Sequence, residues 1–167
     1  MEIGHMEVTD LTPHRTGRLL LENMYKARFG KPLPPVSLTK EGKPFFPDGH
    51  IHFSISHTRH HAFCVLADCP VGIDAEETDR DIRLKLAEKI LSPGEFARWQ
   101  AAPDPHAALL RLWVLKEAQA KCTGQGLRGY PNHTDFCPED PRINTIHGCY
   151  VAVISEEHTC CLTPTHT

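Results

Sequence analysis

Hydrophobic positions between residues 12 and 30 follow a helical spacing. Thr12 and Pro13 suit the N-cap and the first position of a helix, and apolar side chains then recur about one turn apart until Gly30. We therefore predict a helix from Pro13 to the glycine, followed by the proline-rich connector "KPLPPVSL".

The next apolar positions have the spacing of β-strands. In "IHFSISH", Ile51, Phe53 and Ile55 alternate with polar residues, which predicts a strand buried on one face only. "HAFCVLA" and "CPVGIDAE" predict two further strands, the second nearly all apolar until it reaches its acids. "GCYVAVISEE" predicts one more strand near the end of the chain.

Helical patterns dominate the middle of the sequence. Thr78 or Asp79 could cap a helix in "TDRDIRLKLAEKI", whose apolar residues are helically spaced. "SPGEF" combines an N-cap serine, a proline at the first helical position and Glu95 in the capping-box position. The longest predicted helix begins after Asp104 and ends at Gly124.

The order of these elements predicts the fold class. Strands and helices are mixed without strict alternation, so the class is α+β. A chain of 167 residues fits one domain, 1–167, with approximate halves 1–68 and 69–167.

Composition narrows the function. A net charge of −3 without a basic stripe argues against nucleic-acid binding. The acidic N-terminus is no signal peptide, and no apolar run is long enough to span a membrane. Seven cysteines, none in a C-x-x-C pair, predict reduced thiols in a cytoplasmic protein. The histidines of "HTRHH" lack helical ligand spacing, so we expect no metal there.

Asp74 and Glu76 lie two residues apart at the end of the predicted strand "VGIDAEE". With a period of two, Asp74 and Glu76 point to the same side of the sheet. They could simply be a wet strand end, or they could bind a hard cation such as Mg²⁺, which prefers oxygen ligands.

The helix "LWVLKEAQAKCTGQGL" raises a similar choice. Trp113, Glu117 and Lys121 lie one turn apart on one face, where Glu117 and Lys121 could form an ordinary ion pair. Lys116 falls on the apolar stripe and must either extend to solvent or meet an anion. Glu95 is explained equally well by its capping box and by a functional role.

If the three acids lay close together, the electrostatic repulsion between them would indicate a bound ligand. If Glu117 approached Asp74 and Glu76, each like-charge pair at about 4 Å would cost about 4 kcal/mol at an effective dielectric of about 20. Such a cluster would raise its own pKa values or recruit a cation. Nearby lysines would then suit a polyphosphate.

"GKPFF", "FSISHT", "VGIDAEE", "SPGEF" and "LWVLKEAQAKCTGQGL", in this order, resemble the motifs of the 4′-phosphopantetheinyl transferases, in particular the surfactin-synthetase-activating type. The resemblance covers about Pro13 to Phe136. It implies two pseudo-related halves, each with a helix packed on a short antiparallel sheet. It also implies transfer of the phosphopantetheine arm of coenzyme A to a serine of an apo acyl, peptidyl or aryl carrier protein, with release of adenosine 3′,5′-bisphosphate.

The resemblance also implies roles for single residues. Asp74, Glu76 and Glu117 would bind Mg²⁺, or Mn²⁺ in its place, with the coenzyme A pyrophosphate. Lys121 would lie by the phosphates, and Glu117 or a metal-bound water would take the serine proton. Trp113 would be structural. The nucleotide-binding positions would be Arg15, Lys43, Ser56 and His57, with His57 at the 3′-phosphate, and Glu95 and Lys116 match positions of less settled role.

The sequence departs from the family pattern in three places. Ala75 replaces the usual branched spacer between the two acids, the C-terminal sheet region looks shortened, and no basic strand is evident before the first helix. A compact monomer is favoured over an oligomer that shares its sites. The alternatives are a non-catalytic relative that binds coenzyme A or a carrier, and a different Mg²⁺-dependent phosphotransfer enzyme.

Overall fold

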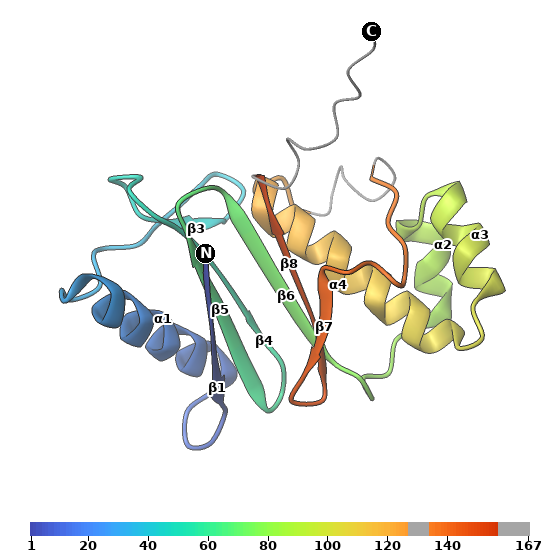
Figure 1. Cartoon of the computed structure of the whole chain (residues 1–167), viewed down its shortest axis with the longest axis horizontal. Helices are drawn as coiled ribbons and strands as arrows, with labels where there is room; N and C mark the ends of the chain where they lie inside the picture. The colour runs from blue at the N-terminus through green and yellow to red at the C-terminus, as the bar shows by residue number, and fades with distance from the viewer. Residues whose placement is uncertain (127–133, 157–167) are drawn as a thin grey trace, which may run out of the picture.

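A computed structural model describes residues 1–126 and 134–156, and its antiparallel sheets and helices confirm the α+β class. Helix α1 covers one side of the central strands and helix α4 the other (Figure 1). The candidate site lies where α4 meets these strands.

The first part of the chain contains one long helix and an antiparallel sheet in the order β1-β5-β4. The predicted helix is confirmed: the Thr12 side chain accepts the Arg15 amide, and Gly30 ends the helix with a left-handed φ of 66°. The elements are β1 (Glu2–Glu7), α1 (Pro13–Phe29), β2 (Ser37–Leu38), β3 (Pro44–Phe45), β4 (His52–His57) and β5 (His61–Ala67).

The second part places two longer helices beside a sheet in the order β6-β8-β7. The predicted capping box at Ser92 and Glu95 is present, and the longest helix ends at Gly124 as expected. The elements are β6 (Val71–Glu77), η1 (Leu84–Leu86), α2 (Ala87–Ile90), α3 (Pro93–Ala101), α4 (Pro105–Thr123), β7 (Ile143–Ile146) and β8 (Cys149–Ser155).

Both faces of β5 are buried, and successive side chains along the strand belong to two different cores. Cys64 and Leu66 belong to the core under α1, whereas Phe63 and Val65 pack against residues of β6 and β8. Leu109 and Leu112 of α4 belong to a third buried cluster on the far side of the second sheet. The division into halves at about residue 68 stays a prediction.

A pair of serines joins the two sheets, and here the sequence prediction for this strand was wrong. Ser54 and Ser56 of β4 are both 5% exposed, although the alternation had placed them in solvent. Their hydroxyl oxygens accept the backbone amides of Ile73 and Ala75 on β6, each at 3.1 Å. A polar position was therefore compatible with burial because a neighbouring strand supplied the donors.

Other elements also differ from the sequence prediction. Strand β1 was not predicted, and neither were β2, β3 and β7; β1 is defined by its register with β5, from Glu2 opposite Leu66 to Glu7 opposite His61. The helix expected after Thr78 is wrong, because the chain makes a turn there and stays extended at Arg83 before the short η1 and α2.

Five cysteines lie in the described residues, and all five are free thiols; Cys160 and Cys161 lie outside them. No helix within residues 1–126 and 134–156 has the length and apolar character required to cross a membrane.

Candidate active site

The position of α4 depends on Gly72 in β6. A Cβ atom at this residue would lie 2.0 Å from the Ala118 carbonyl oxygen and 2.4 Å from the Cys122 nitrogen, far inside van der Waals contact. The missing side chain lets the helix backbone lie directly on the strand. Two residues further along β6, Asp74 meets Lys121 of the helix.

Asp74 is buried in a charged and hydrogen-bonded group. Its Oδ1 lies 2.7 Å from the Lys121 ammonium and accepts the Ser56 hydroxyl at 2.9 Å. Lys121 also donates to Ser56 Oγ at 3.2 Å. The other carboxylate oxygen of Asp74, Oδ2, is buried and has no hydrogen-bond partner among the described residues. A buried carboxylate oxygen without a donor is costly unless a ligand supplies its partner.

Glu76 follows on the same side of β6 and is bound by two donors. The Trp113 indole donates to Glu76 Oε1 at 3.2 Å, and Arg80 forms an ion pair with the same oxygen. The half-buried Trp113 thus connects α4 to the end of β6, in agreement with a structural role.

Glu117 lies one turn before Lys121 on α4. Its carboxylate has no hydrogen bond or ion pair with a described residue, since Lys121 pairs with Asp74 instead. Burial, followed by the negative charge of Asp74, raises the pKa of Glu117, and the charges of Lys121 and Arg80 oppose this shift only in part.

These side chains line one cavity of about 370 Å³. A second hollow of about 280 Å³ shares Glu117 and Lys121 with it and extends past Lys43 toward Gly124. The structure therefore brings a group of predicted residues to one cavity: Ser56, His57, Asp74, Glu76, Glu117 and Lys121.

The acids suit a divalent cation in kind, but they are not arranged around one. Within the described ranges, no three His, Cys, Asp or Glu side chains form a ready-made metal site. However, three carboxylates share the cavity and Asp74 Oδ2 is unsatisfied, which is the donor chemistry that Mg²⁺ binds. The residues present fit this ion, which would replace the Arg80 guanidinium as the partner of Glu76.

The predicted nucleotide-binding residues lie around the cavities at different depths. Lys43 donates to the Cys122 carbonyl at the end of α4 at 2.5 Å, and burial lowers the pKa of its ammonium. His57 is at the cavity, where burial and then Lys121 lower the pKa of its imidazole. Arg15 is exposed in the first turn of α1 and lines neither cavity.

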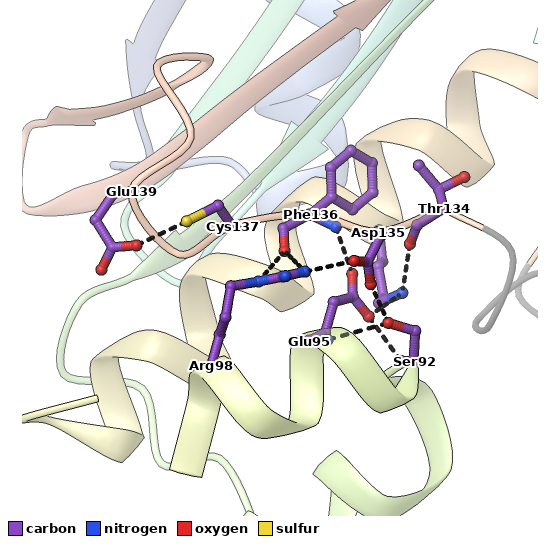
Figure 2. Close-up of polar contacts among 9 residues, drawn as sticks. Ser92, Glu95, Arg98, Thr134, Asp135, Phe136, Cys137 and Glu139 are labelled. Carbon is purple, nitrogen blue, oxygen red and sulfur yellow. Dashed lines mark hydrogen bonds and ion pairs between the residues drawn. The ribbon is translucent and has the colours of Figure 1, made fainter. Parts of the chain in front are cut away.

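Glu95 and Lys116 lie elsewhere and contact each other. Glu95 Oε2 and the Lys116 ammonium are 2.7 Å apart, and their side chains are 0% and 2% exposed. Glu95 also accepts the amides of Ser92 and Phe136, so it connects the start of α3 to the segment after α4 (Figure 2). This geometry indicates a structural pair and not contact with a cofactor in either cavity.

One charged residue of the acidic cavity, Arg80, was not identified from the sequence. Arg80 is four residues after Glu76, which is a familiar ion-pair spacing on helices, but Glu76 lies near the end of a strand, so the helical rule did not apply. A turn brings the two together through the Arg80 amide, which donates to the Glu77 carbonyl at 2.9 Å.

The cavity combines three carboxylates with a lysine ammonium where helix α4 packs against strand β6. The family model of the 4′-phosphopantetheinyl transferase superfamily matches residues 70–162, which include β6 and α4. The chain belongs to this superfamily, and the resemblance seen in its motifs is confirmed.

Similar proteins carry the corresponding name. The chain is 30% identical over 129 residues to the 4′-phosphopantetheinyl transferase gsp of Aneurinibacillus migulanus, covering 75% of this chain and 54% of that protein. It is 32% identical over 130 residues to 4′-phosphopantetheinyl transferase psf-1 of Bacillus pumilus, covering 74% and 55%. A 4′-phosphopantetheinyl transferase of Bacillus subtilis is 32% identical over 123 residues, covering 68% and 54%. The chain thus spans about half the length of these curated relatives.

Proposed function

We propose that this protein transfers the 4′-phosphopantetheine group of coenzyme A to a serine of an apo carrier protein. The serine oxygen forms a bond to the phosphorus that bears the pantetheine arm. The bond from this phosphorus to the bridging oxygen breaks, and adenosine 3′,5′-bisphosphate leaves with the electron pair. Three acids and an ammonium in one cavity carry this proposal.

The acidic side of the cavity suits the reacting pyrophosphate. Asp74, Glu76 and Glu117 would hold Mg²⁺, or Mn²⁺, and the ion would neutralise phosphate charge when bound. Glu117 would accept the serine proton, directly or through water, because its carboxylate faces the cavity without a described ion-pair partner. Positioning and charge neutralisation supply most of the catalysis in phosphoryl transfer.

The basic residues would bind the rest of coenzyme A. Lys121 lies between the two hollows and would stabilise the departing phosphate. Lys43 and His57 lie on either side of it, with His57 proposed for the 3′-phosphate. Ser56 would act mainly by fixing Asp74 and Lys121, and Arg15 would require a nucleotide that extends toward α1.

The partners follow from the reaction. We propose coenzyme A and an acyl, peptidyl or aryl carrier protein as partners, with no role for nucleic acid or membranes. We also propose that the protein is a monomer and that it acts in the cytoplasm. The names of the similar proteins support the transferase activity, although the chain covers about half of each.

A mass measurement tests the function. Purified protein, coenzyme A, Mg²⁺ and a panel of apo carrier proteins should yield a carrier heavier by one phosphopantetheine. Glu117→Gln should lower the rate by roughly 100-fold or more while the protein stays folded, since general base catalysis contributes about 10²–10⁴. Glu22→Gln, on the exposed side of α1, is the matched control.

The outcomes separate the alternatives. Tight binding of coenzyme A without transfer to any carrier would favour a non-catalytic relative, and consumption of another nucleotide would favour a different phosphotransfer enzyme. A Glu117→Gln variant that is as fast as the Glu22→Gln control would remove Glu117 from the reaction.

A further inference from the structure

Arg80 holds one of the acids that the proposed function assigns to a cation. Its guanidinium pairs with Glu76 Oε1, and its Cζ lies 5.9 Å from the centre of the Trp113 ring. The Trp113 indole donates to the same oxygen. One carboxylate oxygen therefore carries a neutral donor and a charged donor together.

The two donors have different consequences for a metal ligand. A neutral N–H on a ligating carboxylate orients it and is compatible with metal binding. A guanidinium stays protonated, neutralises the carboxylate and repels an incoming cation. Since Lys121 likewise pairs with Asp74, two of the three acids assigned to the cation, Asp74 and Glu76, each have a cationic partner.

The Arg80 guanidinium has alternative acidic partners nearby. Its side chain is 42% exposed, and its backbone is fixed by the turn to Glu77, so the guanidinium can move while the chain stays in place. It also lines a hollow of about 520 Å³ that contains Asp79 and Asp81. These acids offer the guanidinium alternative partners outside the proposed cation site.

We propose that Arg80 is a positioning residue that competes with the divalent cation for Glu76. The inference rests on the proposed function. Arg80 neutralises Glu76 until the cation binds, and binding of the cation transfers the guanidinium to the neighbouring acids. The free cation consequently binds weakly, and the pyrophosphate of coenzyme A supplies the negative charge that retains it. Arg80 thus couples cation binding to the co-substrate.

Binding of Mn²⁺ alone tests this competition. Free Mn²⁺ is measured by electron paramagnetic resonance in titrations of wild type, Arg80→Gln and Arg83→Gln, each with and without coenzyme A. Arg83 is a suitable control because it lines a neighbouring hollow but not the acidic cavity. Thermal unfolding of each variant confirms that the fold is retained.

Without coenzyme A, Arg80→Gln should bind Mn²⁺ roughly fivefold more tightly than wild type, which is the effect of losing an ion pair of about 1 kcal/mol. Coenzyme A should then strengthen Mn²⁺ binding less in Arg80→Gln than in wild type. Arg83→Gln should behave as wild type.

Equal or weaker Mn²⁺ binding by Arg80→Gln, or no binding by either protein, would overturn the competition. Fluorescence of Trp113 in a Trp99→Phe background gives a second measurement: Mn²⁺ should change it in the wild-type site and less in Arg80→Gln. Neither measurement requires transfer, so failure of the proposed function would appear separately as carriers that gain no mass.

Discussion

Replacement of Lys116 by methionine tests whether the Glu95–Lys116 pair is structural. The substitution nearly preserves side-chain volume, but it leaves a carboxylate that is 0% exposed without its counter-ion. Breaking a buried ion pair by removing one partner costs about 3–5 kcal/mol. For a protein of this size each kcal/mol corresponds to roughly 2–4 °C, so the Tm should fall by roughly 6–20 °C.

The assay combines calorimetry with a rescue variant. Adding Glu95→Gln to Lys116→Met removes the uncompensated charge and should restore about half of the lost stability. Recovery should be incomplete, because Glu95 uses one oxygen for the Ser92 amide and the other for the Phe136 amide. An amide has a single acceptor oxygen and would serve both poorly.

Coenzyme A binding distinguishes this account from a cofactor-binding role. At about 15 °C, where we expect the variant to be folded, its Kd for coenzyme A should stay within about threefold of wild type, a change worth less than 1 kcal/mol. A Tm drop of less than about 2 °C would refute the buried-pair reasoning. A tenfold loss of affinity in a folded variant would instead place Lys116 at the cofactor.

Two further predictions concern a support of the site and a cluster of histidine rings beside β1. Gly72→Ala should push α4 away from β6 and lower both stability and transfer, whereas the exposed control Glu22→Gln on α1 should change neither; equal transfer rates in the two variants would contradict the role of Gly72. Acid should destabilise the ring cluster of His5, His61 and His147, because burial and then the two neighbouring rings lower the pKa of His5. The unfolded chain then binds more protons near and below about pH 6.5, so the free energy of unfolding should decrease from pH 7 to pH 5, and less steeply in His5→Gln. If urea titrations gave the same pH dependence of the free energy of unfolding for the two proteins, this prediction would be contradicted.

Local signals in the sequence predicted the elements that local physics determines. The helix at Pro13, the capping box at Ser92 and the glycine end of α4 were all correct because caps act within a few residues. Strand β1 was missed because its stability comes from pairing with a strand more than fifty residues away.

The candidate site shows the same division. Periodicity placed Asp74 and Glu76 on one side of β6, and helical spacing placed Glu117 beside Lys121, but neither pattern shows that the strand and the helix meet. Meeting depends on Gly72, whose role is visible only when the helix backbone is seen against it. The ion pair of Glu76 with Arg80 was likewise hidden, because it is made across a turn.

The serine contacts between β4 and β6 also join the two walls of the candidate cavity. One wall, with His57, belongs to the first sheet, and the other, with Asp74, belongs to the second. Because β4 and β6 belong to different sheets, these two hydroxyl–amide contacts stand between them where neighbouring strands of one sheet would share a main-chain ladder. Ser54 and Ser56 are therefore the positions at which a substitution would act on the spacing between the two walls of the cavity.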